Sequence, residues 1–429
     1  KSRFEMERSS RIKAFYKLDI AEKLKVVKDF ASLSDEEVMM LNTGRPDMES
    51  VERMVENVIG VIGMPFGIAT NFLVNGKDYL IPMVTEESSV IAAASNGAKM
   101  VRAKGGFTTS CTGSFMAVQI QVDNTRDPEN ASREIIKHKQ ELLEMANTQS
   151  TTLPKLNAGA KDIKVDIVNG WYGPMVIVRL IVDVCDAMGA NIVNTMGEFI
   201  AYKIEDLTGG KVFLRVVDNY AIDRLARAEC IVDKQVLGGE EVVDAMLRGY
   251  SCAYHDQHRA TGHNKGVMNG IMGVVLATGN DARAVESAFH SYAARDGRYR
   301  ALPVWSKNEE GDLTGFLEMP APVGTIGGMT KHHPVARIAL KILGVESADE
   351  LGQILAAVGL ASKLAAERAL ASEGIQHGHM KLHATNISSM AGAQGDEINV
   401  VAQTMIEKGK VSLGLAKELL EKVRNSCRK

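Results

Sequence analysis

Apolar side chains in the first fifty residues recur at the spacing of a helix. The pattern runs from Leu18 to Phe30. Further on, Ser34 is followed three residues later by Glu37, the pair that forms a capping box at a helix start. The pattern predicts a helical arm, an element that large enzymes often pack against a partner subunit.

Between positions 66 and 106 the pattern changes to two apolar strands followed by a helix. Asn75 and Gly76 are a hairpin signal between the strands. The second strand ends at Thr85-Glu86-Glu87, and the small residues from Ser88 onward predict a tightly packed helix. A carboxylate at this junction is explained either by catalysis or by the helix dipole alone.

Residues 107–220 are predicted to form an inserted domain. Strand-like, β-branched segments lie at 115–123, 174–184 and 211–217, and a charged helix is expected at about 129–146. The middle strand leads into a helix at Asp186-Ala187-Met188-Gly189-Ala190-Asn191. Free N–H groups at such a helix start can hold a pyrophosphate. Short turns of this kind more often only connect, and the absence of GxGxxG excludes a Rossmann prediction.

The stretch from Tyr254 to Gly279 combines charged residues with an apolar run. Arg259, His263 and Lys265 lie in a segment interrupted by glycines. The run 274–277 is expected to be a buried strand, followed by a turn and a helix over 282–294. Asp281 would then lie at a strand-to-helix junction, where α/β proteins place catalytic groups. On spacing alone, a surface lysine and an ordinary N-cap aspartate are the commoner explanation.

Bulk properties narrow the classes of function. The 429 residues are 45% hydrophobic and carry a net charge of −3, which allows two or three domains with large cores and argues against nucleic acid as a partner. The five cysteines are scattered without CxxC, as expected for a reducing cytoplasm. No signal peptide or membrane span is expected.

Five motifs occur in one order along the chain: ENVIG at 56–60, TEE at 85–87, DAMGAN at 186–191, HNKG and GND at 263–266 and 279–281, and GHM at 378–380. In this respect the chain resembles the soluble class of 3-hydroxy-3-methylglutaryl-CoA (HMG-CoA) reductases of archaea and bacteria. The resemblance implies an α/β (α+β) fold made of a large acyl-CoA-binding domain, an inserted small non-Rossmann dinucleotide-binding domain and a C-terminal helical flap. The implied bounds are 1–107 and 220–375 for the large domain, 108–219 for the small domain and 376–429 for the flap.

The resemblance also implies roles for individual residues. The catalytic residues would be Glu87, Lys265, Asp281 and His379. The substrate-binding residues would be Ser89, Arg259, Asn269 and Glu56. The cofactor-binding residues would be Asp186, Met188, Gly189, Asn191, Asn219 and Ser150.

The implied reaction reduces HMG-CoA to mevalonate and CoA in two hydride transfers. A fixed ammonium from Lys265 would offset the negative charge on the carbonyl oxygen, and His379 would protonate the departing CoA thiolate, since histidine titrates near neutral pH. Glu87 would act as the acid of the second reduction, and Asp281 would couple it to Lys265. Arg259 would hold the free carboxylate of the substrate.

The expected cofactor is NADPH, with NADH as the alternative, and no metal. NAD-using relatives carry an aspartate where this chain has Ser150, and the nearby Lys155 suits a 2′-phosphate. His379 and His383 have the spacing of two metal ligands, but no supporting Glu-x-x-His or cysteine accompanies them. The resemblance further implies a homodimer, or a multiple of dimers, with the active site between subunits.

The chain departs from the family pattern at Ser88, Gly262, Ser362 and Lys363, where relatives have Pro, Thr, Gln and Asn. Two alternatives remain open. One is a non-catalytic CoA-thioester-binding protein, which the presence of all four catalytic residues disfavours. The other is a different acyl-CoA reductase with Cys252 or Cys111 as a covalent nucleophile, although neither has a paired histidine motif.

Overall fold

The computed structural model describes residues 9–44, 46–372 and 375–426, and side chains at 375–382 and 426 are not among the described ones. In this part the chain forms three antiparallel sheets with the orders β1-β2, β3-β8-β10-β9 and β5-β6-β4-β7. The strands are β1 (Phe66–Val74), β2 (Lys77–Val84), β3 (Thr108–Cys111), β4 (Phe115–Asp123), β5 (Gly159–Gly170), β6 (Gly173–Asp183), β7 (Lys211–Val217), β8 (Leu225–Val232), β9 (Val304–Lys307) and β10 (Leu313–Pro320).

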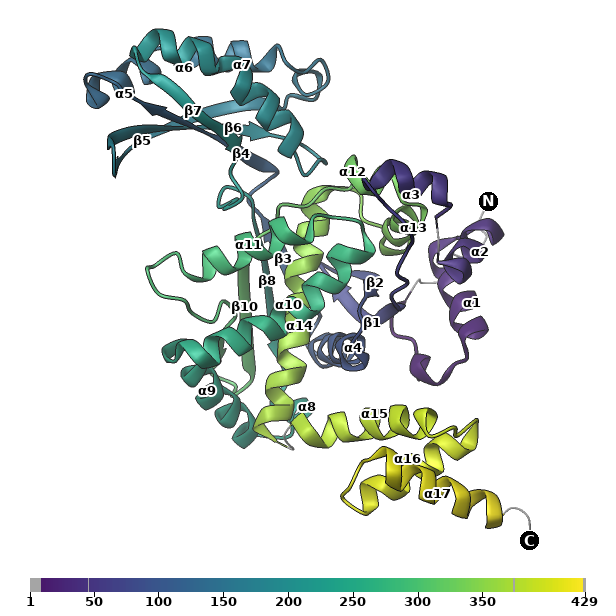
Figure 1. Ribbon diagram of the computed structural model, residues 1–429. Helices are drawn as coiled ribbons and strands as arrows, with labels where there is room; N and C mark the ends of the chain where they lie inside the picture. Colours follow the sequence, from purple (N-terminus) through teal and green to yellow (C-terminus); the bar gives the residue numbers. More distant parts are fainter. Residues whose placement is uncertain (1–8, 45, 373–374, 427–429) are drawn as a thin grey trace, which may run out of the picture.

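Helices cover the sheets and form both ends of the chain (Figure 1). Those of the first half are α1 (Ile20–Ala31), α2 (Asp35–Thr43), α3 (Met48–Met54), α4 (Ser88–Arg102), α5 (Pro128–Lys137), α6 (Lys139–Asn147) and α7 (Ala190–Thr208). Those of the second half are α8 (Lys234–Leu237), α9 (Glu240–His255), α10 (Gln257–Ala277), α11 (Ala282–Ala293), α12 (Gly328–His332), α13 (Pro334–Leu343), α14 (Ala348–Ala371), α15 (Ile375–Met390), α16 (Asp396–Glu407) and α17 (Leu413–Ser426). Short 3-10 turns lie at Phe15–Lys17 and Pro154–Leu156.

The predicted helical arm is present as α1 to α3. The Ser34 side chain caps α2, and Glu37 returns a bond to the Ser34 backbone, so the predicted capping box is confirmed. The arm packs on α13 through a small apolar cluster that includes Val27 and Ile338. The hairpin at Asn75-Gly76 is also confirmed, because it joins the antiparallel strands β1 and β2.

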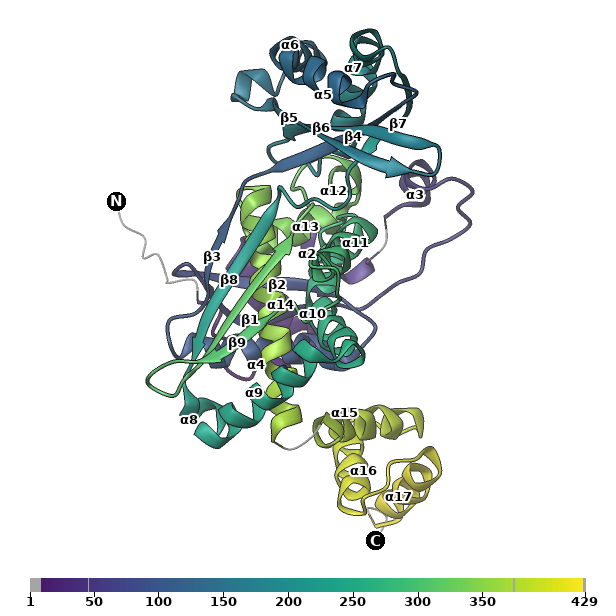
Figure 2. The same cartoon turned by 90° about the vertical axis from the view of Figure 1, so that its left-hand side faces the viewer.

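A second body is formed by the sheet β5-β6-β4-β7 with α5, α6 and α7 on one face (Figures 1 and 2). It has its own apolar core, which runs from Met116 to Ala221 and also includes Ala288 of α11. The single charged helix expected at 129–146 is wrong: α5 ends at Lys137 and α6 starts at Lys139. The break lies at His138, whose ψ of 14° leaves the helical range.

The expected strand at 274–277 is also wrong. These residues are the last turn of α10, which is continuous from Gln257 to Ala277 despite four glycines. Helix α10 contacts α9, α14 and β2, so apolar residues occur all around it and the amphipathic period is lost. A short apolar run in such a helix cannot be told from a buried strand by periodicity. The turn after it and helix α11 agree with the expectation.

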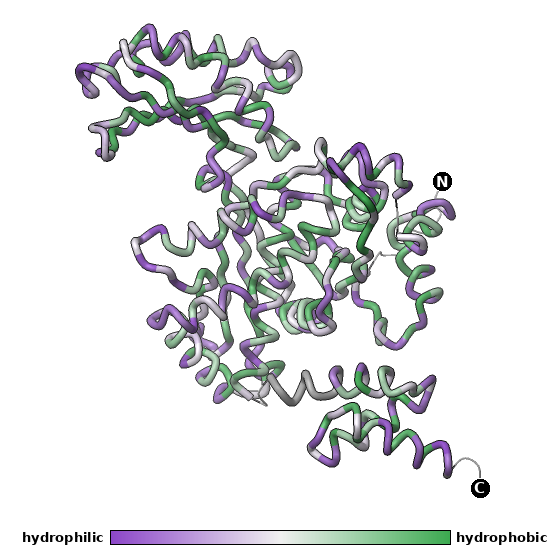
Figure 3. The backbone as a smooth tube through the Cα atoms, in the orientation of Figure 1, coloured by the Kyte–Doolittle hydropathy of each residue, from purple (hydrophilic) through white to green (hydrophobic). Residues whose placement is uncertain are grey.

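The centre of the molecule is helix α14, which lies against α4, α10 and β8. Its residues are buried along almost the whole length, and Figure 3 shows hydrophobic positions concentrated along the elements around it. Helices α15 to α17 enclose a separate core that includes Val401, Met405 and Leu419. They reach the rest of the chain through α14 and α4.

Candidate active site

Glu87, Ser89 and Lys265 meet at the start of α4. Glu87 ends the connection from β2 and occupies the N-cap position of α4 without capping it by its side chain. The Ser89 hydroxyl donates to Glu87 Oε1 at 2.7 Å, and Lys265 Nζ lies 3.7 Å from Glu87 Oε2. Lys265 is 66% and Glu87 38% exposed, so the pair is open to an incoming anion. Residues predicted from two separate stretches of the sequence are therefore neighbours in space.

Helix α10 carries the other predicted acyl-binding residues. Arg259 lies in its first turn, with its backbone N–H donated to Asp256 at 2.9 Å. Asn269 follows Lys265 by four residues, which places both side chains on one helix face. Asn269 is half-buried. Helix α10 thus carries two cations and an amide, of which Lys265 and Asn269 share one face.

Asp281 is placed differently from the prediction. It caps α11, where its Oδ1 accepts from the backbone N–H groups of Arg283 at 3.0 Å and Ala284 at 3.2 Å. Arg283 Nη2 lies 3.1 Å from the same oxygen. Between Lys265 and the end of α10 lie twelve helical residues, or about 18 Å of helix. Within the described residues no ion pair joins Asp281 to Lys265 or Glu87, and Asp281 lies at a helix-to-helix turn instead of after a strand.

The two remaining predicted residues are His379 and Glu56. His379 is on α15, but its side chain lies outside the described residues, as does that of His377. Glu56 is exposed in the irregular connection between α3 and β1. Among the described residues no cluster of histidine, cysteine and acidic side chains is arranged to hold a metal ion.

The loop after β6 has the form of an anion site. Gly189 is the N-cap of α7 with φ of +98°, and a Cβ there would lie 2.6 Å from the Val184 side chain. No side chain caps α7. The amides of its first turn, which include Asn191, therefore point outward with the positive end of the helix dipole. The strand-to-helix connection expected at the DAMGAN motif is confirmed.

The glycine-rich loop after β10 supports this site. The Asp186 carbonyl accepts from the N–H of Thr325 at 2.8 Å, and a Cβ on Gly324 would lie only 2.5 Å from the Met188 nitrogen. The buried Arg224 donates to the Ala187 and Met188 carbonyls. Two motifs that are far apart in the sequence therefore form one structure.

The remaining cofactor candidates have local structural partners. The Asp186 carboxylate accepts from Ala348 N at 2.9 Å, at the start of α14. The Ser150 hydroxyl accepts from the N–H groups of Thr152 and Leu153 in the turn after α6. Asn219 is exposed in the turn after β7.

Sequence reasoning missed a buried polar cluster at the crossing of α10 and α14. Lys363 Nζ lies 2.5 Å from Glu367 Oε1, and the Arg259 guanidinium reaches the same oxygen at 2.9 Å. His263 Nδ1 is 3.2 Å from it, without the angle of a hydrogen bond. Two opposite charges four residues apart in the otherwise apolar α14 were the available signal.

Neither Cys111 nor Cys230 has the surroundings of a nucleophile. Burial raises the pKa of Cys111, and the nearby Asp349 adds to this shift. Burial raises the pKa of Cys230 to about 12. A catalytic cysteine needs the opposite shift. Cys252 is exposed on α9.

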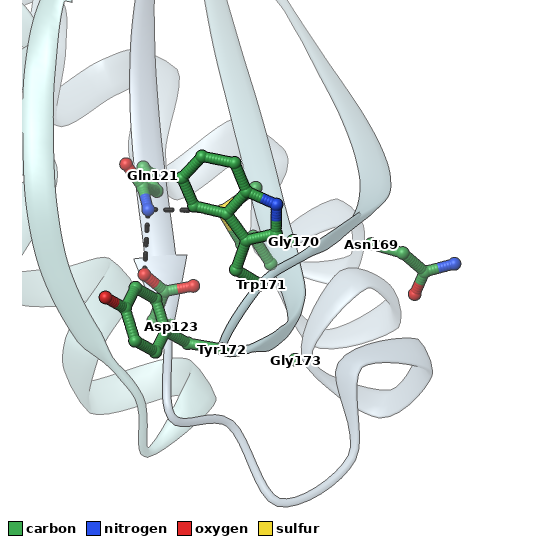
Figure 4. A pocket seen from close by; sticks show the side chains of 8 residues that line it. Gln121, Asp123, Asn169, Gly170, Trp171, Tyr172 and Gly173 are labelled. Atoms are coloured by element: carbon green, nitrogen blue, oxygen red, sulfur yellow. Dashed lines mark hydrogen bonds between the residues drawn. The ribbon is translucent and has the colours of Figure 1, made fainter.

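A hollow of about 390 Å³ lies at the tip of the β5–β6 hairpin, beside Trp171 and Tyr172 (Figure 4). Gln121 Nε2 donates to Asp123 Oδ2 in its wall at 2.8 Å. The hairpin tip and the DAMGAN loop lie at opposite ends of β6, about 30 Å apart along an eleven-residue strand. This hollow is therefore separate from both sites described above.

Comparison with known proteins identifies the family. The family model for hydroxymethylglutaryl-coenzyme A reductase matches residues 19–384. The chain belongs to the HMG-CoA reductases. It is 53% identical over 418 residues to the 3-hydroxy-3-methylglutaryl-coenzyme A reductase of Archaeoglobus fulgidus, with 97% of this chain and 95% of that protein covered. It is also 33% identical to a probable HMG-CoA reductase of Borreliella burgdorferi, with 87% and 86% covered.

Solved structures of the family agree with the fold. A class II HMG-CoA reductase from Streptococcus pneumoniae, described as bound to NADPH in open conformations, is 36% identical, with a TM-score of 0.80 and coverage of 95% of this chain and 100% of that chain. A second structure from the same organism has a TM-score of 0.82. The family and the mixed α and β fold predicted from the sequence are confirmed, and the chain is an oxidoreductase of the HMG-CoA reductase type. No helix in the described part of the chain is both long and apolar enough to cross a bilayer.

Proposed function

We propose that this HMG-CoA reductase forms mevalonate around the Glu87–Lys265 pair, with NADPH as the preferred hydride donor. The observation that carries the proposal is the 3.7 Å approach of Lys265 Nζ to Glu87 Oε2. An ammonium can stabilise a developing alkoxide, and a protonated carboxyl group beside it can then protonate that alkoxide. The direction in which the cell uses the reaction is a separate matter, since the same groups serve both.

Lys265 stabilises the oxyanion, and Glu87 is the acid of the second reduction. The Ser89 hydroxyl holds Glu87 Oε1 and so fixes the other oxygen toward the lysine. Asn269, one turn further along α10, orients the acyl chain. Arg259 pairs with the free carboxylate of the substrate, and Glu56 lies near the acyl-CoA.

The departing CoA thiolate needs a proton, and His379 on α15 is the proposed donor. Helix α15 contacts α4, the helix that begins directly after Glu87. We take residues 376–429 as a flap that brings this histidine to the thioester. Two glycines beside His379 suit a hinged element.

The residues at the start of α7 fit a dinucleotide. The uncapped helix start and the space left by Gly189 would hold the pyrophosphate. Met188 and Asn191 would line it, Asp186 would fix the loop through its bond to Ala348 N, and Asn219 would face the nicotinamide. When bound, the nicotinamide supplies the hydride.

A preference for NADPH rests on the turn after α6. Ser150 and Lys155 offer a hydroxyl and an ammonium, and no carboxylate occupies the Ser150 position. Residues 108–219 are accordingly the proposed nucleotide-binding insertion in a large domain made of 1–107 and 220–375. We further propose a homodimer, or a multiple of dimers, with the active site between subunits.

The direct test follows nicotinamide absorbance with HMG-CoA, using NADPH and NADH in parallel. We expect oxidation of two nicotinamides per thioester and a higher kcat/KM with NADPH. Lys265→Met should lower kcat about 10²- to 10³-fold for both HMG-CoA and mevaldehyde, whereas the control Lys25→Met on exposed α1 should leave it unchanged. Substantial mevalonate formation by Lys265→Met would refute the assigned role.

A further inference from the structure

The buried cluster at the crossing of α10 and α14 contains charged side chains in an otherwise apolar contact between two helices. Lys363 is 2%, Glu367 3% and His263 0% exposed, whereas the Arg259 side chain is 30% exposed. A buried ion pair is by itself weak evidence for a role in stability. Its charge can act on a ligand only where the cluster reaches the surface, which is at Arg259.

A single oxygen organises the cluster. Glu367 Oε1 lies 2.5 Å from Lys363 Nζ, 2.9 Å from Arg259 Nη2 and 3.2 Å from His263 Nδ1. Arg259 is thereby held by one nitrogen. Its remaining donors make no hydrogen bond within the described residues, so they are available to a planar anion.

The charges do not cancel. Burial alone would raise the pKa of Glu367, but contacts with His263 and Lys363 hold it at about 2, so the carboxylate is ionised. Burial lowers the pKa of His263 to about 4, so its ring is neutral at pH 7. Burial lowers the pKa of Lys363, and the adjacent Glu367 carboxylate opposes that shift. With Lys363 and Arg259 both protonated in their contacts to Glu367, the cluster carries one net positive charge, and Arg259 is where that charge meets solvent.

The cluster lies directly behind the proposed reaction centre. A Cβ on Gly266, the residue after Lys265, would lie 3.5 Å from Lys363 Cδ and 3.6 Å from its Nζ. Lys363 thus passes α10 at Gly266, and its ammonium reaches the Glu367 oxygen that also holds Arg259. A charge at this place acts on an anion bound at Arg259.

We propose that Lys363 is a positioning residue for the acyl group. Its ammonium compensates the charge of Glu367. Glu367 can then orient Arg259 while Arg259 keeps a net positive charge for the free carboxylate of the substrate. The inference rests on the proposed function, because it takes that carboxylate as the ligand. Without Lys363, Glu367 would pair with Arg259 alone and the pair would be neutral. A carboxylate would then gain little from approaching it.

The test is a charge cycle that compares the wild type with Lys363→Met and with the double variant Lys363→Met/Glu367→Gln. Lys363→Met should raise KM for HMG-CoA about tenfold or more, with kcat within about twofold. The double variant again leaves one net positive charge on Arg259, so it should recover a large part of the lost affinity. If the cluster only held α10 against α14, the double variant would have the higher KM of the two, because it removes more contacts.

A second ligand distinguishes the loss of carboxylate recognition from a general loss of structure at the site. The Kd of 3-hydroxy-3-methylbutyryl-CoA, which lacks the distal carboxylate, should be the same in the wild type and in Lys363→Met by calorimetry. Thermal melting checks folding, and Lys363→Gln replaces Lys363→Met if the latter does not fold. Equal losses for both thioesters, or a double variant no better than Lys363→Met, would overturn the inference. A wild type that does not reduce HMG-CoA would instead overturn the proposed function.

Discussion

Asp281 has two explanations that a single substitution separates. The structure shows it as the cap of α11, with its Oδ1 bonded to two backbone N–H groups. The family resemblance implies a catalytic role in which the charge of Asp281 couples the titrations of Lys265 and Glu87. Asparagine caps a helix as well as aspartate does but carries no charge, so Asp281→Asn keeps the first role and removes the second.

We expect Asp281→Asn to keep the wild-type melting temperature and to lower kcat about 10²- to 10⁴-fold. Steady-state assays with HMG-CoA and mevaldehyde measure the second effect, and calorimetry the first. Asp47→Asn, at the cap of the exposed α3, is the matched control and should change neither. Full activity in Asp281→Asn would leave this residue as a cap only.

His263 should make stability depend on pH. Burial lowers its pKa from 6.5 to about 4, so below pH 6.5 the unfolded chain takes up a proton that the folded chain refuses. Stability is therefore complete above about pH 6.5 and falls as the pH drops toward 4. The loss between pH 7 and 5 should be about 2 kcal/mol.

Urea unfolding at pH 7, 6 and 5 measures this loss. His263→Gln removes the titrating ring, so this part of the slope should vanish, whereas the control His258→Gln, exposed on the same helix, should keep it. An unchanged slope in His263→Gln would show that other groups cause the acid sensitivity.

At the residue scale, the neighbours of Lys265 were predicted from the sequence, but the buried polar cluster between α10 and α14 was not. Glu87 and Ser89 were identified by motif, and they do meet the lysine. Position 363 was interpreted as the loss of an amide in the substrate pocket. The side chain of Lys363 instead lies in a buried ion pair, and partners on another helix cannot be inferred from residue types along one segment.

At the scale of elements, helix α4 carries Glu87 at its start and is held by a close backbone contact. A Cβ on Gly97 would lie 2.0 Å from the Ala361 carbonyl oxygen of α14 and 2.9 Å from its Cα. Backbone atoms cannot rotate away as a side chain can. Gly97→Ala should therefore push α4 from α14 and lower the unfolding free energy by about 2 kcal/mol or more.

Urea or thermal unfolding measures the effect of Gly97→Ala, and a lower kcat would accompany it if the start of α4 moves with Glu87. Gly414→Ala is the control, because nothing lies within 4 Å of a Cβ at that helical position. It should be neutral or slightly stabilising. Equal stability of the two variants would show that the crossing of α4 and α14 adapts without cost.

The hairpin β1–β2 and the capped helix α2 were predicted correctly, whereas helix α10 was not. The hairpin β1–β2 and the capped α2 have local signals in the sequence. Helix α10 was divided into a loop and a strand because its apolar residues surround it. Three of its four glycines, Gly262, Gly266 and Gly270, were interpreted as breaks, yet Gly270 lies in close contact with Ser362 of α14. Such a contact depends on the tertiary arrangement.

At the scale of the whole molecule, one apolar segment is exposed to solvent, which is unfavourable for a monomer. The connection from α3 to β1 has no helix or strand from 58 to 65, and Ile59 and Ile62 are 100% and 90% exposed. Val55 and Met64 are exposed beside them. Contiguous exposed apolar side chains mark an interaction surface, and the proposed homodimer supplies a partner for it.

Changing both Ile59 and Ile62 to Asp should convert the dimer to a monomer, because burying two carboxylates in an apolar interface is unfavourable. Sedimentation equilibrium measures the mass, and circular dichroism should show an unchanged fold, since neither side chain supports the core. Activity should fall together with dimer content, because the active site is proposed to lie between subunits. Ile136→Asp, at an exposed apolar position on α5, is the control and should remain dimeric and active. An active monomer would show that each chain holds a complete site, and the proposed placement between subunits would then be wrong.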